Sequence, residues 1–331
     1  MDQGTIERIA EATARSRYKT WGFGESIAME GLIAAGGRYR EDARARFESW
    51  ARSAGPLRDE PLAHVTPGVP LLLLHEEQPD PMLWGRILEL ESVLANAKHG
   101  VAGARIHRPD LAGWEHEVWV DCMHLDGPFV ALLGHQTNDP VRLELGVELL
   151  LSHARVLQDE ASGLFSHGFD DATGKPNRVH WGRGQGWALL GLVDTLHLLP
   201  GDGTGVAEIR ERLAALVAGL ARWEQEPGRW STVVDRPETY REASVSAFGA
   251  LGIHRAMRWD LVDQDNAGLV QRAWDATLEH IGPSGKLLGV SDATPVGADA
   301  AHYDARPLGS HTWGQGPALL AAIEVGQSGP G

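Results

Sequence analysis

The amino-acid sequence predicts an all-α protein that folds as a single (α/α)6 barrel domain over residues 1–331. Three observations lead to this expectation. Helical periodicity occurs throughout the chain whereas alternating β-branched runs hardly occur, amphipathic helices alternate with helices that are apolar all round, and no linker-like stretch divides the 331 residues. A chain of this length can bury well over half of its surface.

Six segments have the pattern of outer helices, with apolar residues at helical spacing on one side and charged residues on the other. Each is expected to bury its apolar stripe and to leave its charged face in solvent. These segments span residues 6–18, 40–54, 82–98, 141–158, 206–223 and 266–281.

Six other helices are rich in small and aliphatic residues on every side, which is typical of helices buried between neighbours. Three of them follow a Trp-Gly-x-Gly motif, at residues 21–24, 181–184 and 313–316. An open solenoid of helical hairpins is the alternative, but its repeats are shorter, at about 34 to 47 residues. The steps here are roughly 45 to 70 residues, which favours a closed barrel whose inner helices begin near Gly24, Thr66, Asp126, Gly184, Glu242 and Gly316.

In a closed barrel the N-terminal ends of the inner helices share one face, where their dipoles favour anionic groups. Long, polar, aromatic-rich connections are expected at that face, and connections of such length are usually functional. They cover residues 107–128, 163–187, 229–244 and 297–317.

Composition excludes several classes of partner. The formal charge of −15 argues against nucleic acid and anionic membranes, which require a basic face, but it allows a small anionic substrate in a locally positive pocket. No apolar run approaches the roughly 20 residues of a membrane span, and the polar N-terminus does not resemble a signal peptide. The single cysteine, Cys122, suits a reducing compartment, so a cytoplasmic location is expected. Nothing in the sequence indicates the oligomeric state.

Tryptophan is unusually frequent, with 12 residues against four tyrosines and six phenylalanines. Aromatic rings at a barrel mouth can stack on sugar rings, although core packing is an equally good explanation for any single one. The candidates for sugar binding are Trp21, Trp119, Trp181, Trp187 and Trp313.

Asp121 is the candidate for acid–base chemistry. It lies in WVDCMHLDGPF between apolar neighbours, which favour the neutral, protonated form of a carboxyl group and so suit a general acid. The alternative is a helix cap, for which Asp126 is the better candidate. His124 lies one helical turn from Asp121 if the helix has already begun there.

The string HWGRGQGW contains Arg183 at a glycine-rich helix start, where a guanidinium is suited to a bidentate grip on a carboxylate. The glycines also fit a dinucleotide-binding loop, but the preceding strand and the rest of that fingerprint are missing.

Other polar residues are ambiguous. His107, His167 and Asp170 could form further walls of a site, although Asp170 also fits an exposed acidic turn, and Glu242 fits a helix cap as well as a ligand contact. A zinc site built from Asp121, Cys122, His124 and His311 lacks a second ligand pair at ordinary spacing, and adjacent residues such as Asp121 and Cys122 point to different sides of a helix. Neither a metal nor another cofactor is therefore expected.

These motifs, in this order, resemble the unsaturated uronyl hydrolases of glycoside hydrolase families 88 and 105, which are (α/α)6 barrels. The similar segments are WGFG, WVDCMHLDGPF, SGLFSHGFD, HWGRGQGW, GRWSTVVDRP…YREASVSA and GSHTWGQGPALLAAIE. The resemblance implies that Asp121 is the catalytic aspartate and that pocket positions match His167, Trp181, Arg183 and Trp187, with His107 as a further pocket histidine.

The chain departs from the family at two places. The family carries another important aspartate at the start of inner helix two, where this chain has His64 and Thr66 but no acid, and Phe169 replaces the usual tryptophan.

The implied substrate is a small anionic oligosaccharide with a 4,5-unsaturated uronic acid at its non-reducing end. Hydration of the vinyl ether would use Asp121 as both acid and base. Two alternatives remain: a conventional glycosidase that pairs Asp121 with Asp170 or Glu242, and a carbohydrate-binding protein without activity.

Overall fold

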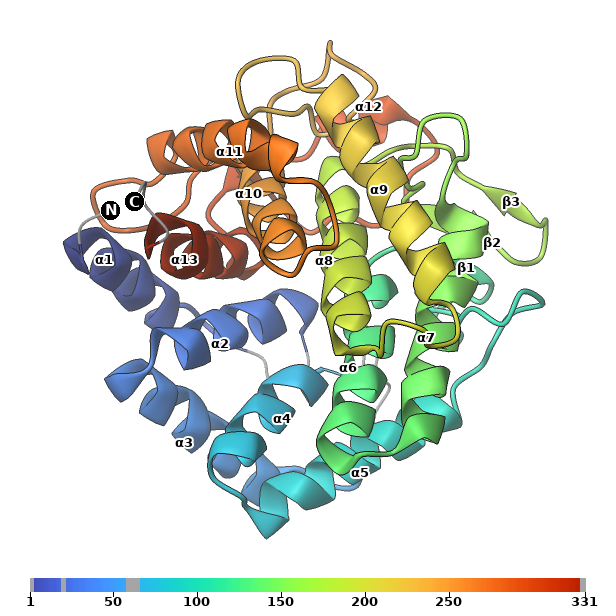
Figure 1. Ribbon diagram of the computed structural model, residues 1–331, viewed down its shortest axis with the longest axis vertical. Coiled ribbons are helices and arrows are strands. Elements are labelled where there is room, and N and C mark those ends of the chain that lie inside the picture. Colours follow the sequence, from blue (N-terminus) through green and yellow to red (C-terminus); the bar gives the residue numbers. More distant parts are fainter. Residues whose placement is uncertain (1–2, 19–21, 58–65, 328–331) are drawn as a thin grey trace.

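The computed structural model describes residues 3–18, 22–57 and 66–327, and it is the predicted barrel (Figure 1). Inner and outer helices alternate along the described chain. The inner helices are α2 (Phe23–Ala35), α4 (Gly68–Glu77), α6 (Cys122–Thr137), α8 (Gly182–Leu198), α10 (Ala243–Arg258) and α13 (Thr312–Gln327). The outer helices are α1 (Gln3–Ala14), α3 (Gly37–Ser53), α5 (Pro81–Ala95), α7 (Pro140–Leu157), α9 (Val206–Arg222) and α11 (Ala267–Glu279).

The inner helices form a closed ring. Each packs against the next, from α2 through α4, α6, α8 and α10 to α13, and α13 then packs against α2. Helix α13 also contacts α1, so the two ends of the chain meet in the wall of the barrel (Figure 1). This contact between the first and last inner helices excludes the open solenoid.

Local sequence explains how the outer helices begin. Helices α5 and α7 each start with Asp-Pro: the carboxylates of Asp80 and Asp139 accept hydrogen bonds from the first free amides, and the following prolines need no amide partner. Burial follows the predicted pattern, because α9 and α11 bury one stripe whereas nearly every residue of α8 is buried.

Glycines allow the inner helices to approach closely. A Cβ atom on Gly316 of α13 would lie 2.7 Å from the Ala28 amide nitrogen of α2, and one on Gly191 of α8 would lie 2.3 Å from the Met123 carbonyl oxygen of α6. Both neighbours are backbone atoms of the facing helix, so any larger residue would force the helices apart.

The predicted start of inner helix three is wrong. Helix α6 begins at Cys122, and Asp126 lies inside it, fully buried. The Asp126 carboxylate does not cap the helix, because Arg105 holds it in a bidentate ion pair at 2.6 and 3.0 Å. An aspartate inside an apolar helix is tolerated here because a buried cation is paired with it.

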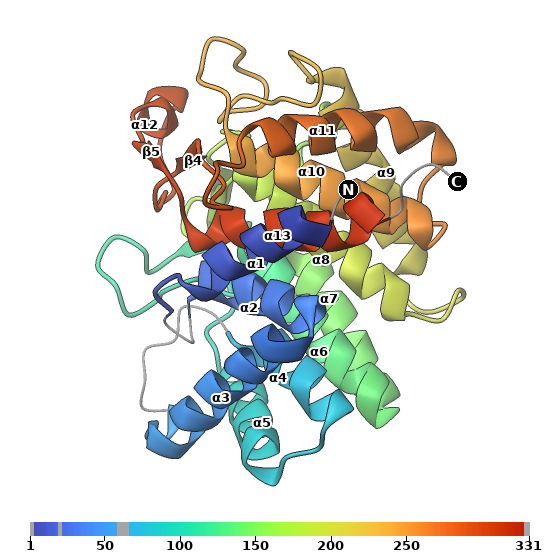
Figure 2. The same cartoon turned by 90° about the vertical axis from the view of Figure 1, so that its left-hand side faces the viewer.

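Short strands, which the all-α prediction omitted, order the long connections. Strand β2 (Gly168–Asp170) pairs antiparallel with β1 (Glu117–Trp119) and with β3 (Lys175–Pro176), and β4 (Val290–Ser291) pairs with β5 (Leu308–Gly309). With the short helix α12 (Ala300–Asp304), they lie in the connections that precede α6, α8 and α13. Figure 2 shows β4, β5 and α12 on the same side of the barrel as the loop before α6.

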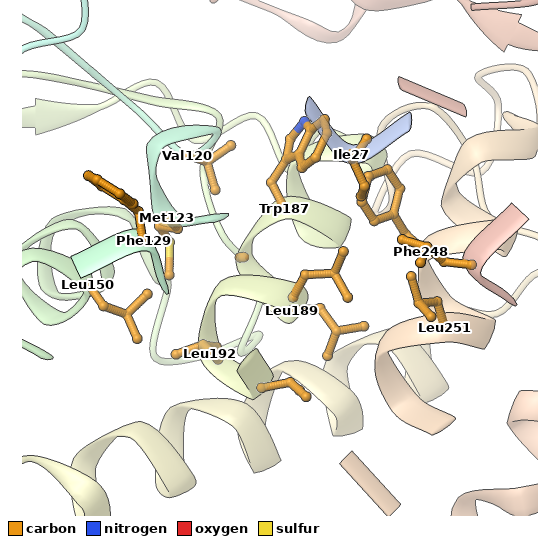
Figure 3. Close-up of a cluster of buried hydrophobic side chains, with 14 of the residues drawn as sticks. Ile27, Val120, Met123, Phe129, Leu150, Trp187, Leu189, Leu192, Phe248 and Leu251 are labelled. Carbon is orange, nitrogen blue, oxygen red and sulfur yellow. The ribbon is translucent and has the colours of Figure 1, made fainter. Parts of the chain in front are cut away.

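The core fills the ring between the inner helices. Figure 3 shows Trp187 of α8 beside Ile27 of α2 and Phe248 of α10, with Leu189 and Leu192 further along α8. All five side chains are at most 1% exposed. The barrel is therefore packed across its axis at this level rather than open as a channel.

We predict that Gly191→Ala lowers the free energy of unfolding by about 1–3 kcal/mol, because the new methyl group would overlap the Met123 carbonyl. The matched control is Gly85→Ala on the exposed side of α5, where a Cβ meets nothing within 4 Å. That variant should be stabilised by about 0.5–1 kcal/mol. Denaturant unfolding of both variants measures the difference, and equal effects would contradict the close-approach explanation.

Candidate active site

Asp121 lies where β1 passes into α6, and it is 2% exposed. It occupies the N-cap position of α6, yet its side chain makes no capping hydrogen bond. The backbone at this point is fixed by the neighbouring Val120 amide, which donates to the His167 carbonyl across the β1–β2 pair. Sequence analysis offered helix capping as the alternative role for Asp121, and the structure leaves the carboxylate free of that role.

His167 is the nearest polar partner of Asp121. Its Nε2 lies 3.4 Å from Asp121 Oδ2, and both atoms are buried without a hydrogen bond of ordinary geometry. Burial lowers the pKa of His167, and the nearby Asp121 charge opposes that shift. The imidazole is therefore neutral at pH 7, and the carboxylate has only a loose contact with it.

Two of the predicted sugar-binding tryptophans form the walls around this pair. The His167 ring lies 4.2 Å from Trp181 and 5.4 Å from Trp119, measured between centroids. His107 stacks on Trp119 at 3.9 Å, so it supports that ring. Trp119, Trp181 and His107 are all at most 5% exposed. These rings hold His167 and offer no open surface for a sugar.

Trp187 and His124 lie between the two ends of the barrel; the mouth is the end at which the inner helices begin and at which Asp121 lies. Trp187 contacts Phe23 at the mouth, and His124 stacks on Trp187 at 5.4 Å. His124 also lines a cavity of about 560 Å³ among the C-terminal ends of the inner helices, where its Nε2 lies 3.8 Å from Glu30 Oε1. The expected substrate contact of His124 therefore has no support in its placement.

The half-buried aromatic surface lies at α2 and α13. Trp313 stacks on Phe23 at 5.9 Å and on His311 at 4.7 Å, and all three rings are partly exposed. Its indole Nε1 donates to the Ser291 carbonyl, which fixes the ring. Among the predicted tryptophans, Trp313 has a partly exposed ring, whereas Trp21 lies outside the described residues.

Arg183 is buried in a set of protein acceptors at the start of α8. One terminal nitrogen donates to Glu242 and to both oxygens of Ser291, and the other donates to the Asp292 carbonyl and the Thr294 hydroxyl. Its Nε has no partner, but this atom is also buried.

The Arg183 guanidinium is only 1% exposed and lies over Trp181 and Trp313. Burial lowers its pKa, and the charges of Glu242 and Asp121 oppose that shift. The expected bidentate grip on a substrate carboxylate is therefore not what Arg183 does in this structure. It joins the start of α8 to α10 and to β4.

The two carboxylates that could have paired with Asp121 have other roles. Glu242 caps α10 by accepting from the Val245 amide, and it also accepts from Arg183 and from the Ser291 amide. Asp170 closes a turn by accepting from the amides of Ala172 and Thr173, as the acidic-turn interpretation predicts. The β1–β2 register puts Asp170 opposite Glu117, four residues before Asp121.

Among the described residues, Cys122, Asp126 and His153 are close enough together to be considered as metal ligands. The Arg105 guanidinium pairs with Asp126 and lies 3.4 Å from the Cys122 sulfur. A metal cation would be placed against this buried positive charge. Burial strongly raises the pKa of the Cys122 thiol, and the Arg105 charge opposes that shift without reversing it, so the thiol is protonated.

Tyr303 is not among the site residues predicted from the sequence. This residue of α12 is fully buried, and its hydroxyl lies 2.8 Å from His167 Nδ1. The two residues are 136 positions apart, and no motif spacing connects them.

The start of inner helix two lacks the aspartate that the family carries there. In the structure Thr66 is buried with no partner for its hydroxyl, and His64 lies outside the described residues.

Comparison with known proteins identifies the family. The model of Glycosyl Hydrolase Family 88 matches residues 3–328. The chain belongs to this family. It is a glycoside hydrolase, and the resemblance that its motifs suggested is confirmed.

Similar proteins support this assignment along the whole chain. Unsaturated rhamnogalacturonyl hydrolase YesR of Bacillus subtilis is 29% identical, covering 97% of this chain and 93% of its own. A crystal structure of a possible family 105 member from Salmonella enterica superposes with a TM-score of 0.83 at 25% identity, covering 98% and 93% of the two chains. The unsaturated glucuronyl hydrolase of Bacillus sp. GL1 shares the fold, with a TM-score of 0.74 at 20% identity and coverage of 98% and 97%.

Within the described part of this family 88 hydrolase, no helix combines the length and the apolar character that crossing a bilayer requires.

We predict that Arg183→Met destabilises this hydrolase by about 3–5 kcal/mol, because it leaves the buried Glu242 charge without its cation. The double variant Arg183→Met/Glu242→Gln should recover much of that loss. Arg236→Met, at an exposed arginine, serves as the control. Thermal and denaturant unfolding measure the effects. A stable Arg183→Met protein with only a raised KM would contradict the structural role and restore the substrate-clamp interpretation.

We also predict that acid destabilises the fold through buried histidines. Burial lowers the pKa of the fully buried His153. As the pH falls through about 6.5, this histidine is therefore protonated in the unfolded chain while it stays neutral in the folded chain. Stability should therefore fall as the pH drops below about 6.5, by at most about 1.4 kcal/mol per pH unit for each such histidine. In His153→Gln this slope should be shallower between pH 6.5 and 5, and an unchanged slope would exclude His153 as a contributor.

Proposed function

We propose that this hydrolase removes a 4,5-unsaturated uronic acid from the non-reducing end of oligosaccharides that a polysaccharide lyase has produced. The observation that carries the proposal is the state of Asp121 at the barrel mouth. Its carboxylate is buried, does not cap its helix, and has one loose partner in His167. A buried polar group that lacks its full set of hydrogen-bond partners in the fold is a candidate catalytic group.

The chemistry begins at the C4=C5 double bond, which with the ring oxygen forms a vinyl ether. A proton added to C4 gives an oxocarbenium ion, and water then adds at C5 to form a hemiketal. The hemiketal opens to a C5 ketone and leaves a hemiacetal at C1, which expels the aglycone as an alcohol and becomes an aldehyde. The net reaction consumes one water, and no metal or redox cofactor takes part.

One carboxyl group can perform both proton transfers. Asp121 in its protonated form donates to C4, and the resulting carboxylate accepts a proton from the water that attacks C5. Each turnover returns Asp121 to its protonated state. The neighbouring apolar residues Val120 and Met123 are both fully buried, so they exclude bulk water from the position where these proton transfers take place.

Substrate binding combines electrostatic attraction with stacking on aromatic rings at the mouth. The N-terminal ends of the inner helices attract the uronate carboxylate through space. The stacked pair Trp313 and Phe23 offers a partly exposed ring surface for a sugar. Trp119 and Trp181 act indirectly, since they orient His167.

The rhamnogalacturonyl subclass is the favoured substrate. YesR, which aligns over almost the whole of both chains, is named an unsaturated rhamnogalacturonyl hydrolase. A conventional glycosidase is less well supported, because the other carboxylates considered, Asp170 and Glu242, are engaged in a turn and in an ion pair. The absence of an acid at Thr66 is the feature that favours a binding protein without turnover.

We predict that Asp121→Asn lowers kcat on an unsaturated disaccharide by at least about 100-fold, because the amide cannot donate and then accept the proton. The melting temperature should stay close to that of the unaltered protein, since the carboxylate makes no capping bond. Asp275→Asn on the exposed face of α11 is the control, and it should keep full activity.

The matched saturated disaccharide separates the candidate functions. The proposed reaction requires the double bond, so the saturated compound should release no product. Release from the saturated compound would identify a conventional glycosidase. Binding of the unsaturated compound without turnover would identify a carbohydrate-binding protein, and full activity of Asp121→Asn would remove this residue from the reaction.

A further inference from the structure

The hydrogen bonds behind His167 determine which of its nitrogens carries the proton. His167 lies between Tyr303, at 2.8 Å from Nδ1, and Asp121, at 3.4 Å from Nε2. A neutral imidazole has one donor nitrogen and one acceptor nitrogen. Backbone groups, whose donor and acceptor roles cannot change, settle the choice.

Asn177 is the first step from the backbone. Its Oδ1 faces the amides of Gly168 and Val179, each at 3.3 Å, and its Nδ2 donates to the Gly297 carbonyl at 2.9 Å. Flipping the amide would put oxygen against a carbonyl and nitrogen against two N–H groups. The orientation of Asn177 is therefore fixed, and Nδ2 is also the atom that faces the Tyr303 hydroxyl, at 3.2 Å.

Tyr303 is the second step. Its hydroxyl oxygen accepts from Asn177 Nδ2 and from the Gly297 amide, which lies 3.0 Å away. A phenolic hydroxyl has one proton to donate, and the remaining neighbour of this oxygen is His167 Nδ1. The hydroxyl thus donates to Nδ1, which must be unprotonated to accept.

We propose that Tyr303 is a positioning residue, which holds His167 as the Nε2–H tautomer so that this N–H faces Oδ2 of Asp121. The inference rests on the proposed function for its catalytic meaning. Because an N–H group that faces Oδ2 disfavours a second proton on that oxygen, the proton that Asp121 delivers to C4 is carried on Oδ1. Tyr303 and Asn177 therefore select the oxygen of Asp121 that reacts.

The protonation states agree with this arrangement. Burial is the main cause that lowers the pKa of His167, which keeps the imidazole neutral. Burial also raises the pKa of Tyr303 well above its ordinary value, so its hydroxyl keeps the proton that it donates. The rings of Trp181 and Trp119 pack on His167 and restrict its rotation.

Tyr303→Phe tests the proposal, because it removes the donor to Nδ1 and keeps the ring. The expected loss in kcat is roughly 10- to 100-fold, the range typical of partners that orient a functional histidine, with KM changed less than about 3-fold. Tyr39→Phe is the matched control: it removes a hydroxyl that bonds Glu7 on the outer layer and should leave kcat unchanged.

A double-mutant cycle tests whether Tyr303 acts through His167. In His167→Gln the amide nitrogen can take the place of Nε2 and donate to Asp121 without any tautomer to select. Tyr303→Phe should then cost less than about 3-fold in that background. Losses that simply multiply would show that Tyr303 acts by another route, and would overturn the proposal.

The tautomer itself can be observed without any substrate. Two-bond ¹H–¹⁵N correlation spectra of labelled protein distinguish Nδ1–H from Nε2–H, and the His167 signals are those missing from His167→Gln. The expected result is Nε2–H in the unaltered protein and a mixture or Nδ1–H in Tyr303→Phe. An Nδ1–H tautomer in the unaltered protein would refute the inference even if uronyl hydrolysis is established, whereas Nε2–H without turnover would refute the proposed function alone.

Discussion

The arrangement of the barrel mouth depends on the hydrogen bonds and the ion pair of the buried Arg183 guanidinium. This group is bonded to the carboxylate that caps α10, to the β4 residue Ser291 and to the loop that follows β4. The Ser291 carbonyl also accepts from Trp313 at the start of α13. A buried charge is costly unless its donors are paired, so the starts of α8, α10 and α13 must keep the positions that pair it. The need to pair this buried charge therefore fixes the part of the mouth that is formed by the starts of these three helices.

The other half of the mouth is arranged differently. There the buried carboxylate of Asp121 faces a neutral histidine at 3.4 Å and takes no part in capping α6. The two acids, Glu242 and Asp121, thus have different roles. Glu242 is paired with the Arg183 guanidinium and caps α10, whereas Asp121 makes no capping bond and faces the neutral His167. The chain of Asn177, Tyr303 and His167 orders the one contact that Asp121 does make.

Much of the fold could be predicted from the sequence because periodicity reports burial directly. The amphipathic pattern of 206–223 and the nearly all-apolar run that follows Gly184 each have one stable place in a helical barrel. The start of α6 was mispredicted because a cap was assumed for Asp126, while Arg105, 21 residues earlier, neutralises it inside the helix. Pairing of charges across such distances has no local signal.

The site was predicted less completely for a similar reason. Motif resemblance selected Asp121 and His167, and they are in contact, but it could not distinguish a tryptophan that faces a sugar from one that braces a histidine. Trp181 and Trp313 follow the same motif pattern, yet one is buried and the other partly exposed. Arg183 looked like a ligand clamp because the sequence does not show that its two terminal nitrogens already donate to protein acceptors such as Ser291 and Thr294. Tyr303 is joined to the site only by folding.

The most direct test is the ultraviolet absorbance of the conjugated C4=C5 bond, followed as purified protein acts on unsaturated disaccharides from rhamnogalacturonan, pectin, glycosaminoglycan and ulvan digests. We expect the absorbance to disappear with the rhamnogalacturonan-derived disaccharide, as vinyl-ether hydration requires. Loss with another disaccharide alone would keep the reaction and change the substrate subclass. No loss with any of them, from protein that unfolds cooperatively, would contradict the account.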